Sequence, residues 1–202
     1  MATYGEQFYR IGRYKQDNIT RYDFNNPSLV EWQFGTDDSV PDSDSSNPYD
    51  LVFVNESKAY VIRYGASSIW VVDPSVSSSD DDLFKIGEID LQAYDDDGVP
   101  EMSAAVIHNN RLYVVMQAMD DSSTPGDAYL AVIDTTTDEE INVNDDALNG
   151  YPLSVKNPLG LDVIDNNLFV LGVGRYARNW LPVPAPAEYT GGIEKIDSIF
   201  QV

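Results

Sequence analysis

The chain has 202 residues, no cysteine, one histidine and a formal net charge of −22, from 34 acidic and 12 basic residues. The lack of cysteine excludes disulfides, thiolate catalysis and cysteine-ligated metal centres, and a single histidine excludes multi-histidine zinc or copper sites. A surface this negative repels nucleic acids and anionic membranes and attracts cations and basic proteins. No run of about 18 apolar residues occurs, so we expect no membrane insertion.

A two-strand pattern recurs four times: an aromatic-aliphatic strand, a loop, and a second strand that ends in Asp. The aromatic positions are 51, 53 and 56 residues apart, and they are Tyr9, Tyr60, Tyr113 and Phe169. The matching aspartates are Asp23, Asp73, Asp134 and Asp197. Self-similarity at about 50 residues, with strands as the unit, indicates β-propeller blades. Each blade is a four-stranded antiparallel meander, with strands lettered A to D.

The blades follow one another along a single propeller-type domain over 1–202. The first repeat, 1–48, supplies strands B, C and D at 7–13, 18–23 and 29–34, and lacks strand A. The second, 49–101, has all four strands, at 51–54, 59–64, 69–73 and near 84–91. The third, 102–157, has them at 104–107, 112–116, 129–134 and near 140–143. The fourth, 158–202, has A, B and C at 161–164, 168–172 and 192–197 and lacks strand D.

Four repeats are too few for a propeller of seven or eight blades, which needs roughly 350–400 residues at this period. We therefore expect a fragment or half of a larger propeller. Its exposed strand edges would need the missing part of the propeller or a second copy of the chain. Because Met1-Ala2-Thr3 leads into the middle of a repeat, we also expect a parent protein whose signal segment is absent here, secreted, periplasmic or on the cell surface.

One family resemblance rests on the third repeat. Leu112-Tyr113-Val114, followed by Ala131-Val132-Ile133-Asp134 and Thr135-Thr136-Thr137, resembles the YVTN-type repeat of secreted β-propellers. Asn110 and Pro158 also fit that pattern, and the resemblance covers about 50–200 well and 1–48 weakly. It implies the fold and an extracytoplasmic setting. Its relatives include lactonase-like enzymes, quinoprotein subunits, surface-layer proteins and binding scaffolds, and the repeat signature carries no catalytic residue to transfer.

The loops predict which face carries a site. In a propeller, the D-to-A and B-to-C loops emerge on one face. The B-to-C span grows from 13 residues between Tyr60 and Asp73 to 28 between Phe169 and Asp197. Variable insertions on one face of a constant scaffold commonly carry binding sites. The longest of these loops holds basic and aromatic groups that could grip a ligand or partner, although packing on a neighbouring blade is the simpler interpretation: Arg175, Tyr176, Arg178 and Trp180.

An acidic D-to-A loop is the candidate metal site. Asp95, Asp96, Asp97 and Glu101 place hard oxygens around a Gly turn, and calcium takes six to eight such ligands. The spacing is not that of an EF-hand loop, and a solvated acidic turn is the alternative. Calcium is the one cofactor that the sequence suggests.

The functional prediction is an extracytoplasmic scaffold or recognition module that binds a ligand or protein partner on the long-loop face. A non-catalytic role is favoured, because no nucleophile-elbow sequence exists. One alternative is a calcium-dependent, lactonase-like hydrolase. Another is a structural surface or filament component that assembles through strand edges.

Overall fold

The computed structural model describes residues 1–37, 45–79, 81–120, 122–144 and 147–197. Strands dominate the described chain, with two helical turns of three residues each, η1 (Asp81–Leu83) and η2 (Gln92–Tyr94). No described helix has the length and apolarity to cross a membrane. The chain divides into two compact units, unit 1 (Met1–Leu91) and unit 2 (Gln92–Val202), each holding two repeats. The single domain expected over 1–202 stays a prediction.

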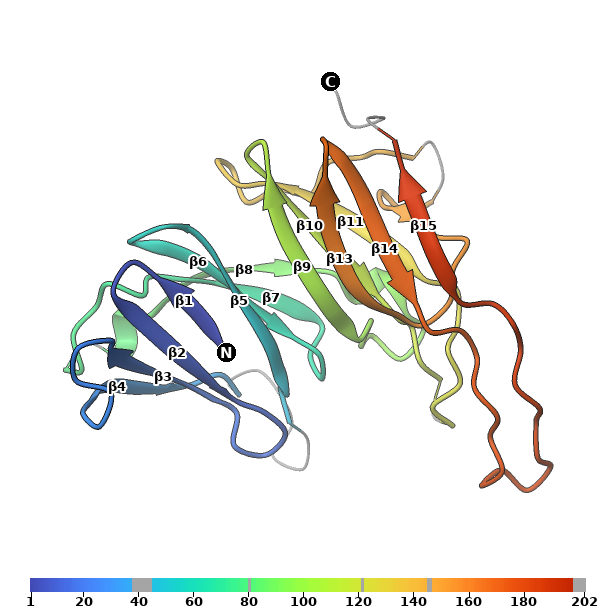
Figure 1. Cartoon of the computed structure of the whole chain (residues 1–202), viewed down its shortest axis with the longest axis horizontal. Coiled ribbons are helices and arrows are strands. Elements are labelled where there is room, and N and C mark those ends of the chain that lie inside the picture. Colours follow the sequence, from blue (N-terminus) through green and yellow to red (C-terminus); the bar gives the residue numbers. More distant parts are fainter. Residues whose placement is uncertain (38–44, 80, 121, 145–146, 198–202) are drawn as a thin grey trace. The chain divides into compact units, whose positions relative to one another are not determined.

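Repeat 1 is a complete four-stranded meander in the order β1-β2-β3-β4 (Figure 1). Its strands are β1 (Ala2–Tyr4), β2 (Gln7–Gly12), β3 (Asn18–Asp23) and β4 (Val30–Gly35). The prediction that this repeat lacks strand A is wrong, because β1 pairs with β2 from Ala2↔Tyr9 to Tyr4↔Gln7. Three residues without an apolar run give no recognisable strand signal, and the turn that joins β1 to β2 depends on Gly5, whose φ is +57°.

Repeat 2 follows the same plan in the order β5-β6-β7-β8. Its strands are β5 (Pro48–Asn55), β6 (Lys58–Arg63), β7 (Ser68–Val72) and β8 (Lys85–Asp90). All four lie within a few residues of their predicted positions. The acidic segment at 38–44, part of one predicted D-to-A loop, lies outside the described residues.

Repeat 3 has the order β9-β10-β11-β12 and departs from the prediction at its outer strand. Its strands are β9 (Met102–His108), β10 (Arg111–Met116), β11 (Tyr129–Asp134) and β12 (Tyr151–Pro152). Strand D was expected near 140–143, but Glu140 makes only an isolated bridge to Ile133. The regular fourth strand is β12, which pairs with Tyr129 and Leu130. Two short apolar segments therefore share the outer edge, and neither stands out in the sequence.

Repeat 4 contributes three described strands in the order β13-β14-β15. They are β13 (Pro158–Ile164), β14 (Asn167–Gly172) and β15 (Gly192–Ile196). Residues 198–202, where a strand D was not expected, lie outside the described residues. Four consecutive antiparallel meanders make the chain an all-β protein built of propeller-type blades, as the sequence predicts.

Each unit has its own apolar core between two blades. The core of unit 1 is rich in aromatic rings, and Trp32 packs on Phe34 with ring centroids 4.6 Å apart and on Tyr9 at 5.9 Å. In unit 2, Val115, Leu130 and Val132 of repeat 3 pack with Leu168 and Val170 of repeat 4. Every second residue of a strand faces such a core, and the continuous apolar runs of β6 and β7 are buried on both faces of the sheet.

A recurring backbone contact closes the base of the B-to-C loop in repeats 2, 3 and 4. Two amides at the end of strand B donate to two carbonyls just before strand A of the same blade. The pairs are Tyr64 to Asn47 and Gly65 to Ser46, Gln117 to Glu101 and Ala118 to Pro100, and Val173 to Asn157 and Gly174 to Lys156, at 3.0–3.2 Å. The second residue of each accepting pair, directly before strand A, has positive φ in all three blades: Asn47 at 44°, Glu101 at 48° and Asn157 at 54°. This contact brings the D-to-A and B-to-C loops to one end of the sheet.

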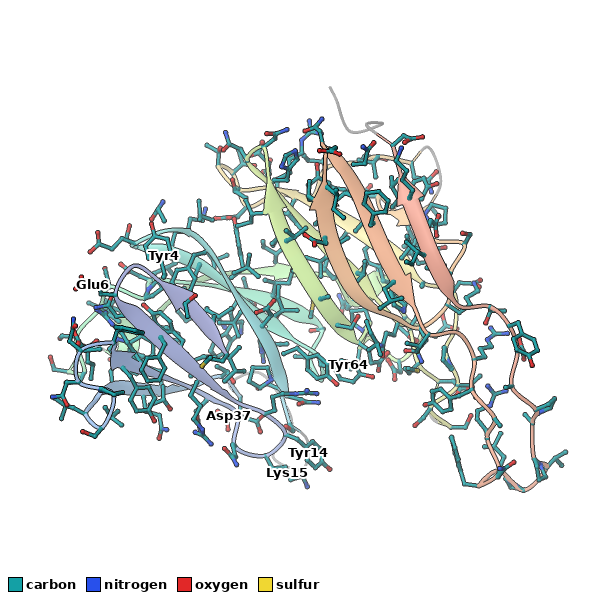
Figure 2. All side chains as sticks on the ribbon, in the orientation of Figure 1. Tyr4, Glu6, Tyr14, Lys15, Asp37 and Tyr64 are labelled. Carbon is teal, nitrogen blue, oxygen red and sulfur yellow. The ribbon has the colours of Figure 1, made fainter. Side chains whose placement is uncertain are left out.

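The two ends of unit 1 show the same sorting of loops. Tyr14 and Lys15 in the β2–β3 loop lie at one end together with Asp37, which follows β4 (Figure 2). Tyr4 and Glu6, at the β1–β2 turn, lie at the opposite end. The loop faces predicted from the meander are therefore those of the structure.

Truncating the aromatic core of unit 1 tests the blade assignment. Trp32 is 3% exposed, so Trp32→Ala should lower the free energy of unfolding by about 3–5 kcal/mol. Chemical denaturation followed by circular dichroism measures this loss. Tyr14→Ala, at a residue that is 67% exposed, should change the same quantity by less than about 0.5 kcal/mol. Equal effects of the two variants would contradict the core described above.

Candidate functional site

A cleft of about 560 Å³ opens in unit 2 among the loops predicted to carry a site. Four connecting segments line it: the segment from η2 to β9, the β10–β11 loop, the β14–β15 loop and, through Leu148, the β11–β12 segment. The polar lining residues are mainly carboxylates, with one guanidinium: Asp95, Asp96, Asp97, Asp120, Asp127 and Arg175. Tyr94, Tyr129, Ala118 and Leu148 add apolar and aromatic surface. The volume lies within the range common for small-ligand sites.

The first wall is an acidic turn after η2. Gly98, with φ +81°, donates its amide to the Asp95 carbonyl at 3.0 Å, and the Asp97 carboxylate accepts the Val99 amide at 2.7 Å. Partial burial, together with the neighbouring Asp97 and Asp96 charges, raises the pKa of Asp95 above its usual range. The turn thus holds several carboxylates close together without a cation among the residues that form it.

Tyr94, directly before the acidic turn, connects this wall to Glu140 and Tyr129. Its hydroxyl donates to the Glu140 carboxylate, and its ring lies 5.4 Å from that of Tyr129 in a tilted arrangement. Burial, and then the bond to Glu140, raises the pKa of Tyr94. Tyr94 therefore stays a neutral hydrogen-bond donor, and it ties the acidic turn to the outer edge of repeat 3.

The second wall is the β10–β11 loop, in which neighbouring residues donate hydrogen bonds to the Asp120 side chain. The Asp120 carboxylate accepts the Ser122 hydroxyl at 2.6 Å and the amides of Ser122 and Thr124 at 2.9 and 2.8 Å. These hydrogen bonds lower the pKa of Asp120. Gly126 closes the loop, because a Cβ there would lie 2.5 Å from the Ala118 carbonyl oxygen. Asp120 is thus a charged group held firmly at the edge of the cleft.

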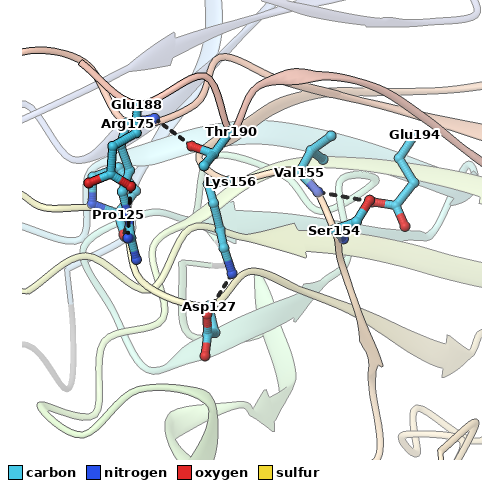
Figure 3. A network of polar contacts seen from close by, with 9 residues as sticks. All are labelled: Pro125, Asp127, Ser154, Val155, Lys156, Arg175, Glu188, Thr190 and Glu194. Atoms are coloured by element: carbon cyan, nitrogen blue, oxygen red, sulfur yellow. Dashed lines mark hydrogen bonds and ion pairs between the residues drawn. The ribbon is translucent and has the colours of Figure 1, made fainter.

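The third wall is fastened to the second by Arg175 (Figure 3). The guanidinium donates from Nε to the Pro125 carbonyl at 2.7 Å and pairs through Nη1 with Glu188 at 3.2 Å. Beside it, Lys156 forms an ion pair with Asp127 at 2.5 Å, which lowers the pKa of Asp127. Arg175 was predicted to grip a ligand, and the structure places it in the cleft but already engaged with the protein.

The other three residues of that predicted set have different surroundings. Tyr176 is 40% exposed and its hydroxyl donates to the Ser123 carbonyl at 3.4 Å, while Trp180 is 58% exposed and lies 5.8 Å from the Tyr176 ring. Arg178 is only 6% exposed, and within the described chain its Nε and Nη1 have no hydrogen-bond partner. None of these three lines the cleft.

The predicted metal ligands do not all meet. Asp95, Asp96 and Asp97 line the cleft, whereas Glu101 does not; it is 8% exposed and accepts the Met119 amide at 2.6 Å. Among the residues that the structure describes, no three His, Cys, Asp or Glu side chains are grouped to hold a metal ion. Calcium binding stays a prediction.

Glu101 has a role that sequence reasoning missed. It occupies the positive-φ position where the sister blades have Asn47 and Asn157, and positive φ suits Asn better than Glu. Burial, with the charges of Asp95 and Asp97, raises the pKa of Glu101 to about 8. Aligning the repeats would have singled out Glu101, because Glu replaces Asn at this position in only one of the three blades.

Comparisons with known proteins leave the family open. No family model matches the chain, and no curated protein matches it. Among solved structures, BamB from Moraxella catarrhalis is similar at 11% identity and TM-score 0.44, over 83% of this chain and 42% of that one. PorZ from Porphyromonas gingivalis is similar at 9% and 0.47, over 87% and 19%. The N-terminal domain of Nup159 is similar at 12% and 0.44, over 97% and 43%. The chain spans less than half the length of each.

Replacing Glu101 should change how stability depends on pH. The pKa of Glu101 is near 4.5 in the unfolded chain and about 8 when folded. The folded state therefore binds an extra proton between these values, and the stability that this proton contributes is lost as the pH rises through about 8. Glu101→Gln stays neutral and keeps an acceptor for the Met119 amide. Relative to the parent it should gain about 1 kcal/mol or more between about pH 5 and pH 9, since each pKa unit corresponds to about 1.4 kcal/mol.

Denaturant unfolding across that pH range measures the difference between variant and parent. Glu139→Gln, at an exposed position in the same unit, serves as the control and should show no comparable gain. A difference for Glu101→Gln that does not change with pH would contradict the buried, protonated carboxyl.

Two arginines of the β14–β15 loop should respond to the same substitution with opposite signs. Arg178→Met removes a buried guanidinium whose Nε and Nη1 lack partners, so it should raise the free energy of unfolding by about 1 kcal/mol or more. Arg175→Met removes the contacts to Pro125 and Glu188 and should lower it by about 1–3 kcal/mol. Paired thermal melts measure both effects. A loss of stability in Arg178→Met would show that this guanidinium has a stabilising partner after all.

Proposed function

We propose that the protein is a non-catalytic recognition module whose cleft in unit 2 binds a basic segment of a partner protein. The observation that carries the proposal is the charge of the cleft. Five aspartates line it, and the single basic residue among its lining is already engaged with Pro125 and Glu188. A cleft with one sign of charge focuses the field and attracts the opposite charge.

Two of the five carboxylates have local partners, and three have little compensation. Asp127 is paired with Lys156, and Asp120 is capped by Ser122 and Thr124 of its own loop. Asp95, Asp96 and Asp97 share one turn with no cation in it, and the pKa of Asp95 is raised in part by its two neighbours. A cationic group that binds there would relieve this repulsion, so the acidic turn is the expected centre of recognition.

The size and lining of the cleft favour lysine or arginine side chains over a bare ion. A volume of about 560 Å³ accommodates several side-chain groups. Tyr129, Ala118 and Leu148 offer apolar surface to the aliphatic stems of such residues while the carboxylates bind their charged ends. Calcium at the Asp95–Asp97 turn remains a second proposal, which would compete with the basic segment for the same oxygens.

The chemistry of the lining favours binding over catalysis. None of the cleft-lining residues is a histidine, a serine or a lysine, so a histidine-activated serine and a nucleophilic lysine are not among them. His108, the one histidine, lies in the β9–β10 turn and contacts Asn166 at 2.5 Å. No feature of the cleft supports the lactonase-like alternative.

An extracytoplasmic location is part of the proposal. It rests on the resemblance of the third repeat to the YVTN-type repeat of secreted propellers, at 112–114 and 131–137. PorZ, similar in fold at 9% identity, is described as a bacterial surface component of a secretion system. A surface setting would expose the acidic cleft to basic partners.

A peptide titration tests the proposal. Isothermal titration calorimetry with a decalysine peptide should show saturable binding at low salt that weakens as salt is added. The triple variant Asp95→Asn, Asp96→Asn, Asp97→Asn should bind the peptide about tenfold more weakly or worse, which corresponds to about 1.4 kcal/mol. A decaglutamate peptide should not bind. Millimolar calcium added in parallel should compete with the peptide if the turn also binds the metal.

A matched control separates this site from general acidity. Glu6→Gln, Asp37→Asn, Glu56→Gln removes the same three charges at exposed positions of unit 1. It should weaken binding by no more than about twofold, because these exposed charges do not line the cleft and salt screens them. Equal losses in both triple variants would mean diffuse attraction by a protein of charge −22 and would overturn the cleft as the site.

A further inference from the structure

The sheet of repeat 4 has an apolar face that no described element covers. Side chains at alternate positions of β13, β14 and β15 point to opposite faces. Leu168, Val170 and Ile196 face the core of unit 2. The residues between them face the other way, and several are large and exposed: Ile193 is 71% exposed, Ile164 52% and Leu171 48%.

The pairing register orders this outer face into rows. One row joins Gly160, Leu171 and Ile193, so two exposed aliphatic side chains lie next to each other. The next row joins Asp162, Phe169 and Lys195. A half-buried phenylalanine in the central strand is therefore flanked by an acidic residue on one side and a basic residue on the other.

The corresponding face of repeat 1 is mixed, because a row in which the Phe8 and Tyr22 rings stack lies next to a polar row. Its middle row joins Arg10, Thr20 and Gln33. Gln33 donates to the Thr20 hydroxyl at 2.7 Å, and Arg10 donates to the Gln16 side chain. Repeat 4 differs in its middle row, where Phe169 stands in place of Thr20 and lies between two groups of opposite charge.

We infer that this face binds the same face of a second copy of the chain, forming a two-fold symmetric dimer. In an isologous interface, each residue of one patch meets the patch of the partner under a two-fold axis. An axis along β14, in the plane between the two sheets, places Phe169 against Phe169. It also places Asp162 of each copy against Lys195 of the other. The row is thus complementary to itself in charge as well as in shape.

Both charged groups are available for this exchange. Lys195 pairs with Asp197 at 2.5 Å, but the Asp197 side chain is 73% exposed, and ion pairs at such exposure contribute little. Asp162 is exposed, and its carboxylate accepts only the adjacent Val163 amide at 2.8 Å among the contacts described. The two aliphatic side chains of the neighbouring row, Leu171 and Ile193, would be removed from water on dimerisation.

Sedimentation equilibrium from micromolar to millimolar protein tests the inference. The parent should show a reversible monomer–dimer equilibrium. Ile193→Lys, at a position exposed enough to leave folding intact, should weaken dimerisation about tenfold or more. Val30→Lys, at a 47%-exposed position of β4 in repeat 1, is the control and should leave the equilibrium unchanged. Circular dichroism confirms that each variant is folded.

Reversing the charges of Asp162 and Lys195 tests whether these residues face each other across the dimer. Asp162→Lys alone and Lys195→Glu alone each place like charges opposite each other and should weaken self-association about tenfold or more. An equimolar mixture of the two single variants should dimerise again, because both cross-pairs are then of opposite sign. The double variant D162K/K195E should dimerise alone.

A parent that stays monomeric at the highest concentration would overturn the inference. So would a dimer that is insensitive to these reversals, or a mixture that associates no better than its components. Open-ended polymers would indicate edge-to-edge strand pairing in place of the symmetric dimer. The peptide titration on the Asp95–Asp97 turn is independent of all these outcomes, because none of its residues lies on the β13–β15 face.

Discussion

The pair of backbone hydrogen bonds at the end of strand B governs the arrangement of each loop face. In three blades, two consecutive amides leaving strand B donate to two consecutive carbonyls entering strand A. The acceptor segment can present both carbonyls because one residue in it takes a left-handed conformation. Asn47 and Asn157 adopt that conformation at low cost, and Glu101 adopts it in repeat 3. This local geometry decides where each long loop leaves the sheet.

The cleft of unit 2 follows from that constraint together with side-chain contacts between neighbouring loops. The backbone pairs of repeats 3 and 4 start the β10–β11 and β14–β15 loops at the same end of the unit. Arg175 then joins the two loops through the Pro125 carbonyl, and Lys156 holds Asp127. The walls are fixed by these contacts, so the acidic turn at Asp95–Asp97 presents its charge to a space that is already shaped.

The sequence predicts the strands well where apolar residues run through a blade and poorly at its edges. The inner strands of repeats 2 and 3 are found within a few residues because continuous apolar runs and turn residues mark them. Strand β1 is too short and too polar to be recognised, and the outer edge of repeat 3 is split between Glu140 and β12. Edge strands have neighbours on one side only, so their composition is weakly constrained.

For the site, the sequence predicts the face and the acidic turn but not the contacts. The growth of the B-to-C loops indicates the end of the sheets where the cleft opens, and Asp95–Asp97 line that cleft. The contact of Arg175 with Pro125 joins loops 50 residues apart, and that of Glu101 with the Met119 amide joins loops 18 residues apart. The burial of Arg178 likewise depends on the folded arrangement of its loop. Such contacts leave no periodic signature in one chain.

The hydrogen-bonded pairs that close the base of these loops also allow loop length to vary without changing the sheet. Once Val173 and Gly174 are bonded to Asn157 and Lys156, the chain that follows can lengthen without moving β14. The entropy cost of a longer closed loop grows only with the logarithm of its length. Segments exchanged between these fixed ends would keep the register of the sheet, which makes the loop face of these blades suitable for grafting new binding loops.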